Sequence, residues 1–408
     1  MKMQVKQIAK VFTGTTPPTN EQKYYESEDI NWYSPGDIVS DSISLKDSNK
    51  KISRLYFQEK NSWPFPQGAV LMVGIGATVG KVAYSDSVCW SNQQINVIVF
   101  DKKKILPKFG AYQLLNKSKE INKKTPVVTL QIFNQSKVRQ IELWLPSLET
   151  QHRIVTYLDT KLSEIDHQVS ILTSKRDAYL RLKKSIINHA VTRGLNTNVK
   201  MKDSGIEWIG EVPEHWEVKR LKNVVECNAK SLGENTPKDS IIKYVEISDV
   251  DHVHGINNIQ SLMFGEAPSR ARRITQKGDI IISTVRTYLK AIAKIEDDDI
   301  IVSTGFAVLH PTKCNGEYLA YYILSESFIN RVEMLSKGTS YPAINASDLV
   351  SINVLIPPLP EQRVIATYLD DKCAKIDTIV SNLNKQISRY ADLKRSLIDE
   401  VITGKRAV

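Results

Sequence analysis

Two stretches of the chain carry apolar residues at alternating steps of three and four positions, with charged and polar residues between them. They span residues 145–192 and 356–403. An apolar seam with a period of 3.5 residues is typical of a coiled-coil helix, and each stretch predicts one helix of about 42 residues, or roughly 60 Å. The predicted seam positions are Leu158, Leu162, Ile165, Val169, Leu172, Tyr179, Leu369, Ile376, Val380, Leu383, Ile387 and Tyr390.

The two stretches are copies of one another. They align without a gap at a constant offset of 211, and Thr156-Tyr157-Leu158-Asp159 matches Thr367-Tyr368-Leu369-Asp370. A proline precedes each predicted helix, and Gly194 and Gly404 lie where each helix should stop. Only a short linker joins the first helix to the segment after it, so a parallel pair would lack the long connection it needs. We therefore predict an antiparallel intramolecular coiled coil with pseudo-twofold symmetry.

The segments before each helix share a looser skeleton. Residues 67–72 and 277–282 both form a glycine turn that leads into a buried strand, and many short strands with few helices indicate an α+β domain. The predicted order is one recognition domain (1–144), a long helix (145–195), a linker with a second recognition domain (196–355) and a second long helix (356–408).

Charge and composition indicate a polyanionic partner. The 408 residues include 55 Lys and Arg against 45 Asp and Glu, which gives a net charge of +10 and a pI near 9.1. Basic proteins gain affinity for nucleic acid by releasing its counterions. The four cysteines are isolated, which argues against disulfides and a zinc site. No apolar run is long enough for a membrane span and no export signal is visible, so we expect a cytoplasmic protein.

The sequence shows no recognisable active site. The run Gly74-Ile75-Gly76-Ala77-Thr78-Val79-Gly80-Lys81 lacks the spacing and the following Ser or Thr of a phosphate loop, so the glycines indicate tight turns between strands. The pair His252 and His254 has no third metal ligand nearby and is interpreted as a solvated loop. We therefore predict a non-catalytic chain that holds no cofactor or metal of its own.

Basic, hydroxyl and aromatic residues are the candidates for DNA contacts, because they suit phosphates and base edges. A solvated surface remains the alternative for any one of them. The candidates are Thr78, Lys81, Gln93, Lys117, Lys123, Lys124, Arg270, Arg272, Arg273, Arg286, Tyr288, Lys337, Thr339, Ser340 and Tyr341.

Several motifs together resemble the specificity subunit of a Type I restriction–modification system. They are Leu359-Pro360-Glu361-Gln362-Arg363 running into the Thr-Tyr-Leu-Asp copy, its counterpart from Gln151 to Asp159, and the stretch from Asp203 to Gly210 followed by Val212-Pro213-Glu214-His215-Trp216. The resemblance covers essentially the whole chain. The first half departs from it, because it lacks the Gly-x-x-Pro-x-x-Trp lead and starts directly at its recognition domain.

The resemblance implies a mechanism. Each recognition domain reads one half of an asymmetric two-part site in double-stranded DNA. The helix pair acts as a ruler, with the half-site centres about 10 bp apart. The helices also dock two methylation subunits, which carry S-adenosylmethionine and flip out the adenine that they methylate. Restriction subunits, which use ATP and magnesium, then join. The alternatives are a stand-alone duplicated DNA-binding or antirestriction protein, and a fused enzyme, which would show methyltransferase and nuclease motifs of its own.

Overall fold

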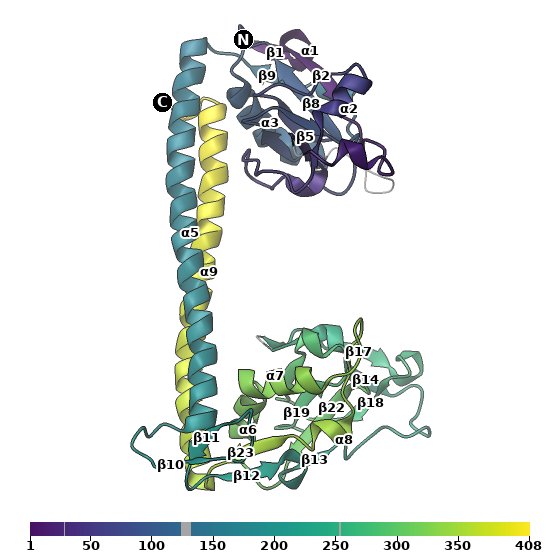
Figure 1. Cartoon of the computed structure of the whole chain (residues 1–408), viewed down its shortest axis with the longest axis vertical. Helices are drawn as coiled ribbons and strands as arrows, with labels where there is room; N and C mark the ends of the chain where they lie inside the picture. The colour runs from purple at the N-terminus through teal and green to yellow at the C-terminus, as the bar shows by residue number, and fades with distance from the viewer. Residues whose placement is uncertain (28, 124–131, 253) are drawn as a thin grey trace. The chain divides into compact units, whose positions relative to one another are not determined.

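The computed structural model describes residues 1–408 except 28, 124–131 and 253. It divides into two compact units, each made of one globular domain and parts of both long helices. Unit 1 comprises Met1–Thr173 and Asn384–Val408, and unit 2 comprises Ser174–Leu383. Figure 1 shows helices α5 (Leu148–Arg193) and α9 (Leu359–Ile402), which contribute to both units.

The long helices run antiparallel within each unit. In unit 1, Lys394 Nζ lies 2.8 Å from an Asp166 carboxylate oxygen, and in unit 2 Lys183 Nζ lies 2.7 Å from Asp377. The 211-residue offset relates the two lysines to each other and the two aspartates to each other. Each copy therefore donates its lysine to the aspartate of the other copy. The α+β fold with two long antiparallel helices is confirmed, and α5 and α9, with 46 and 44 residues, are slightly longer than predicted.

Most predicted seam residues lie between the helices or against the domains. The structure buries Leu158, Leu162, Ile165, Leu369, Ile376 and Leu383. It leaves Val169, Leu172, Tyr179, Val380, Ile387 and Tyr390 half-buried. The half-buried positions occupy the middle stretches of the two helices, where the hydrophobic clusters of the domains add less cover.

The domain of unit 1 has a four-stranded antiparallel sheet and a smaller three-stranded sheet. The first has the order β2 (Ala9–Thr13), β8 (Ile95–Phe100), β5 (Val70–Val73), β6 (Val82–Tyr84), and the second the order β4 (Lys51–Ile52), β3 (Ile30–Tyr33), β7 (Cys89–Ser91). The other elements are β1 (Lys2–Gln4), which pairs with β9 (Glu142–Trp144), and helices α1 (Val5–Ile8), α2 (Arg54–Glu59), α3 (Pro107–Lys123) and α4 (Gln135–Arg139). Short 3-10 turns occupy η1 (Gln22–Tyr24) and η2 (Pro35–Asp37).

The domain of unit 2 repeats this plan. Its antiparallel sheet has the order β13 (Val225–Cys227), β22 (Phe306–Pro311), β19 (Ile280–Ser283), β20 (Ile292–Lys294), and its second sheet the order β17 (Gln260–Met263), β14 (Ile241–Val245), β21 (Ile300–Ser303), β18 (Ala271–Ile274). Three strand pairs complete it: β10 (Met201–Asp203) with β11 (Glu211–Pro213), β12 (Glu217–Arg220) with β23 (Asn353–Ile356), and β15 (Val250–Asp251) with β16 (Gly255–Ile256). The helices are α6 (Gly316–Ile323), α7 (Glu326–Leu335) and α8 (Ala346–Leu349), with 3-10 turns η3 (Leu221–Asn223), η4 (Ile247–Asp249), η5 (Phe264–Glu266) and η6 (Thr287–Leu289).

In both domains the second sheet contains one parallel pair, β3 with β7 and β14 with β21. The domains thus share a strand order although their sequences have diverged.

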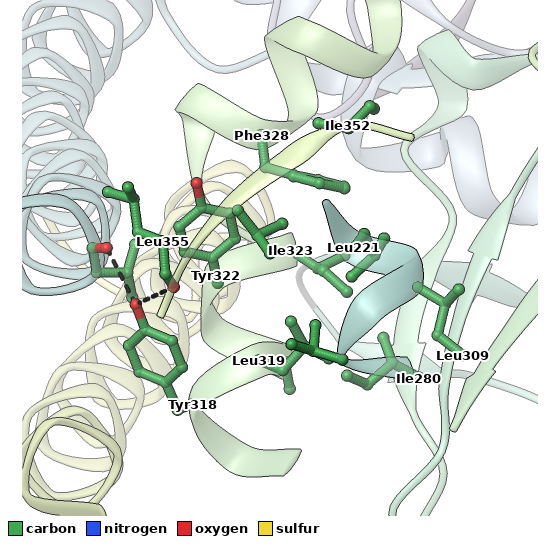
Figure 2. Packing of buried hydrophobic residues seen from close by; sticks show 14 of the residues in the cluster. Leu221, Ile280, Leu309, Tyr318, Leu319, Tyr322, Ile323, Phe328, Ile352 and Leu355 are labelled. Carbon is green, nitrogen blue, oxygen red and sulfur yellow. Dashed lines mark hydrogen bonds between the residues drawn. The ribbon is translucent and has the colours of Figure 1, made fainter. Parts of the chain in front are cut away.

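The main core of unit 2 joins its sheet to the long helices. Tyr318 on α6 is fully buried, and its hydroxyl proton is shared between the carbonyl oxygens of Val191 on α5 and Leu355 on β23. Figure 2 shows the bond to Leu355. Apolar side chains from α6, α7, β19 and β22 belong to the same buried cluster. Burial raises the pKa of the Tyr318 phenol well above its usual value. The domain and the helix ends of unit 2 therefore share one hydrophobic core.

Candidate nucleic-acid interface

The connection from β19 to β20 in unit 2 is a tight turn with two non-glycine residues in the left-handed region. Arg286 and Lys290 both have φ of +51°, and they flank η6. Such residues are uncommon outside glycine and asparagine, and each costs on the order of 1 kcal/mol. The turn directs Arg286 and Tyr288 outward, and both side chains are exposed.

A second loop lies against this turn. Lys337 and Ala343 exchange backbone hydrogen bonds of 2.8 and 2.9 Å, and Thr287 N donates to Pro342 O at 3.3 Å. The Arg286 guanidinium lies over the Tyr341 ring, 5.1 Å from its centroid. Residues 284–291 and 336–343 together form what we call the unit 2 loop pair.

A third backbone segment brings another cation to the unit 2 loop pair. Thr284 N donates to Gly305 O at 2.8 Å, and Thr304 N donates to Arg270 O at 2.8 Å. Arg270, Arg286 and Lys337 are exposed, and none forms an ion pair with a residue that the structure describes. Unpaired cations beside exposed tyrosines suit a polyanion that also offers flat base surfaces.

The remaining unit 2 candidates occupy two places. Thr339 and Ser340 are exposed in the unit 2 loop pair itself. Arg272 and Arg273 lie further along β18: the Arg272 guanidinium packs 4.8 Å above the Phe264 ring, and the half-buried Arg273 pairs with Ser231 in an isolated β-bridge. The structure therefore gathers most of these candidates and directs Arg272 and Arg273 into local packing.

Unit 1 has the same turn with different side chains. Gly74 N donates to Gln94 O and Gly74 O accepts from Phe133 N, both at 2.7 Å. Thr284 makes the equivalent bonds with Gly305 and Ile344 in unit 2.

Two glycines in the unit 1 turn take the left-handed conformations of Arg286 and Lys290. Gly76 has φ of +104° and Gly80 has φ of +90°. Residues 74–80 of unit 1 carry no charged side chain, whereas the equivalent turn in unit 2 carries two.

The unit 1 candidates are less clustered. Lys81 Nζ donates to Ile38 O at 3.1 Å and is half-buried, as are Thr78 and Lys117. Gln93 is exposed and accepts from the Thr16 hydroxyl at 2.8 Å. Lys124 and the side chain of Lys123 lie outside the described residues.

A hollow of about 300 Å³ lies beside the unit 1 turn, and five of its eleven lining residues carry side-chain amides. Gln93, Gln94 and Asn134 contribute to its lining. Exposed amides suit adenine, since one amide can pair with both N6 and N7. The sequence candidates included Gln93 but not Gln94 or Asn134, which the structure places in the same lining. The stretches Asn92-Gln93-Gln94 and Asn134-Gln135-Ser136 were the available sequence signal.

Equivalent hydrogen bonds fix each domain to the start of its own long helix. The buried Gln151 accepts from Leu106 N at 2.8 Å and donates to Pro146 O at 3.0 Å. The buried Gln362 accepts from Asn315 N and donates to Pro357 O, both at 2.7 Å.

A tyrosine adds a second bond at each joint. Tyr112 donates to Asp159 at 2.7 Å and Tyr321 donates to Asp370 at 2.8 Å. Burial and then these hydrogen bonds raise the pKa of both phenols. We call these two sets of contacts the joints; they hold each loop turn at a fixed orientation to the helices within its own unit.

Comparison with known proteins identifies the family. The model of the Type I restriction modification DNA specificity domain matches residues 1–172 and again residues 213–389. The chain belongs to this family. The double match corresponds to the two domains and the helices that follow them, and it does not favour a stand-alone DNA-binding or antirestriction protein.

Specificity subunits from distant organisms are among the relatives. The putative Type I restriction enzyme MjaX specificity subunit of Methanocaldococcus jannaschii is 27% identical over 354 residues, covering 80% of this chain and 75% of the relative. The Type I restriction enzyme EcoDI specificity subunit of Escherichia coli is 22% identical, covering 85% and 79%.

Solved structures share the fold. A chain from a study of complex assembly and conformational transition of the Type I R-M system matches with a TM-score of 0.71 at 16% identity, over 98% of this chain and 97% of that one. The HsdS subunit from Thermoanaerobacter tengcongensis matches with a TM-score of 0.50 at 16% identity, over 100% and 97%. At this identity the likeness concerns the fold alone.

Two further findings concern membrane-spanning helices and metal ligands. None of the described helices is long and apolar enough to cross a membrane. Among the described residues, no group of three or more His, Cys, Asp or Glu side chains is placed to hold a metal ion.

Proposed function

We propose that this chain acts as the non-catalytic DNA specificity subunit of a Type I restriction–modification complex, with each domain reading one half of a two-part target. One observation carries the proposal: the same turn is built twice, on equivalent joints, with different exposed side chains. A repeated frame with divergent contact residues suits two different half-sites. Of the other basic candidates, Lys117 and Arg270 would contact phosphates.

Two methylation subunits would dock at equivalent places on the duplicated helices. Leu182 and Leu393 are related by the 211-residue offset, and 47% and 50% of their surface is exposed. Leu148 and Leu359 form a second exposed pair at 38% and 45%. A single exposed leucine is common on soluble proteins, but the repeat of both pairs at equivalent positions supports two equivalent docking places. S-adenosylmethionine, ATP and magnesium would then belong to the methylation and restriction subunits.

A domain exchange tests the reading assignment. Residues 1–144 are replaced by the first domain of another family member, the full chain is reconstituted with its methylation subunits, and the methylated adenines are mapped. We expect one half of the methylated site to change and the other half, with the spacer, to stay. A target that is unchanged in both halves, or changed in both, contradicts the assignment of one domain to one half-site.

A surface substitution tests the docking assignment. Leu182→Asp with Leu393→Asp should abolish co-purification with the methylation subunit, while the chain stays folded because both positions are exposed. Ser174→Asp with Lys385→Asp is the matched control, since these exposed residues also share the 211-residue offset. Normal assembly of the leucine variant would show that the partner docks elsewhere.

A further inference from the structure

We propose that Arg286 reads a guanine in the half-site bound by unit 2, through the major-groove edge of that base. This inference rests on the proposed function and adds to it the identity of one base and of the residue that recognises it. Four features of the unit 2 loop pair and the segment bonded to it support the inference. They are the backbone conformation of Arg286, the ring that orients it, the absence of an ion-pair partner among the described residues, and the cations on neighbouring backbone segments.

The backbone of Arg286 is held in a conformation that favours glycine. Its φ of +51° corresponds to +104° at Gly76, the equivalent residue of unit 1. A Cβ built at Gly76 would meet no atom within 4 Å, so a side chain at this position projects into open space. Unit 2 tolerates a left-handed arginine where unit 1 has glycine. Strained residues of this kind cluster at binding sites because the surrounding structure must hold them there.

The Arg286 side chain is oriented in advance. Its guanidinium lies 5.1 Å from the centroid of the Tyr341 ring, and Tyr341 is itself 67% exposed. Stacking on a ring fixes the plane of a guanidinium and leaves its edge N–H groups free. Within the described part of the chain no carboxylate forms an ion pair with Arg286, so these donors face solvent.

The chemistry of a free, planar guanidinium matches guanine better than the other bases. Two parallel N–H groups can donate to O6 and N7 of guanine, which is the commonest specific contact in the major groove. Lys337 and Arg270 lie on the neighbouring backbone segments and suit phosphates, which position the protein without selecting sequence. Arg286 therefore supplies specificity and its neighbours supply affinity.

Among the described residues of unit 1, the equivalent turn carries no charged side chain. Gly74, Gly76 and Gly80 have no side chain beyond a hydrogen atom. The surface beside them carries Gln93, Gln94 and Asn134. The two half-sites should therefore differ at the position that faces this turn.

The test uses the full chain assembled with its methylation subunits. After the methylated site is mapped, the half-site of unit 2 is the half that stays unchanged when residues 1–144 are exchanged. Each guanine in that half is replaced in turn by 7-deazaguanine, which lacks only the N7 acceptor, and binding is measured. For the wild-type complex we expect one position at which affinity falls by roughly tenfold.

Variants then connect that base to Arg286. In Arg286→Ala the same 7-deazaguanine should have no further effect, and methylation should spread to sites with other bases at that position. Arg286→Lys keeps the charge but lacks the planar pair of donors, so it should retain general affinity and lose the preference for guanine. Lys337→Ala should weaken binding to every duplex by a similar factor. Arg220→Ala, which removes an exposed arginine at the end of β12, should change no base preference.

Three results would overturn the inference while the proposed function stands. The half-site of unit 2 could contain no guanine, or both Arg286 variants could still distinguish guanine from the other bases. Arg286→Ala could also lose affinity equally for all duplexes, which would make Arg286 a phosphate contact. If the wild-type complex methylates no defined site, the proposed function itself fails. The two failures are therefore distinguishable.

Discussion

Gln151 and Gln362 occupy equivalent positions in the two copies and make equivalent hydrogen bonds to their own domains. Gly76 and Arg286 also occupy equivalent positions, with similar backbone bonds around them, yet one has no side chain and the other presents a guanidinium to solvent. Joints and turns thus differ in how far the two copies have diverged. The glutamine that joins domain to helix is the same in both copies, whereas the exposed turn differs between them while its backbone bonds are kept.

The strongest test of equivalent joints removes a buried side chain from each. Leu158→Ala and Leu369→Ala each delete a leucine that is fully buried beside its joint. Each should lower the free energy of unfolding by about 3 kcal/mol, through lost apolar burial and the cavity that remains. Urea denaturation of both variants measures this. A large loss in one and a negligible loss in the other would show that the two joints are not equivalent.

Removing the joint tyrosine hydroxyls should have a smaller effect. Tyr112→Phe and Tyr321→Phe each remove one hydrogen bond to a carboxylate and should cost about 1.5 kcal/mol at neutral pH. In the first variant Lys108 still donates to Asp159. Urea denaturation again gives the value. Equal losses of unfolding free energy in the two variants would support the equivalence of the two joints. A loss confined to one unit would contradict it.

The same tyrosines predict a pH dependence. Their pKa values are raised in the folded state, so the protonated form is favoured there. The two tyrosines therefore contribute their full stabilisation of the folded state below the unfolded-state pKa of about 10, and this contribution is lost as the pH rises above that value. Denaturation midpoints measured between pH 8 and roughly pH 11 should fall less steeply for the phenylalanine variants than for the wild type. An unchanged slope would contradict the assignment.

The long helices were predictable because their signal is local. A 3.5-residue apolar period, proline before the helix and glycine after it, and a gap-free repeat predicted the helices that the structure has as α5 and α9. The antiparallel pairing followed from connectivity alone.

The reciprocal pairs of Lys183 with Asp377 and Lys394 with Asp166 did not follow from the pattern. The repeat relates the two lysines to each other, but which aspartate each lysine meets depends on the stagger of two antiparallel helices. That stagger is set by the domains at the helix ends as well as by the seam.

The candidate site was predictable only in part, because its residues come from segments far apart in the sequence. Arg286 and Tyr341 were both candidates, but their stacking depends on backbone bonds between two loops. The unusual conformation of Arg286 carries no sequence signal, since left-handed arginine is rare and the surrounding fold imposes it. In unit 1, Lys81 was a candidate by charge, whereas the structure bonds it to the Ile38 carbonyl.

The reciprocal ion pairs offer a fourth test, with a modest effect because the aspartates are largely exposed. Lys183→Ala and Lys394→Ala should each cost about 0.5–1 kcal/mol, and less at high salt. Double-mutant cycles with Asp377→Ala and Asp166→Ala would isolate the two pair energies. Similar coupling energies in the two cycles would show that the two copies are equivalent along the helices as well as at the joints. A pair energy of zero in either cycle would confine that equivalence to the helix starts.

The smallest effect concerns the turn itself and has the opposite sign. Arg286→Gly removes the penalty of a left-handed non-glycine residue, on the order of 1 kcal/mol or more. It also gives the unfolded chain more freedom and removes the stacking on Tyr341, which together offset most of that gain. We expect a net stabilisation of about 0.5 kcal/mol, seen as a higher urea midpoint, together with the loss of guanine preference.

Gly76→Ala, the counterpart of this variant in unit 1, should instead destabilise the fold, because alanine at φ of +104° is strained even though the space around it is open. A stabilised Arg286→Gly beside a destabilised Gly76→Ala would show that unit 2 is less stable because it holds an arginine in this conformation. A destabilised Arg286→Gly would mean that the stacked guanidinium stabilises the fold by more than the strained backbone destabilises it.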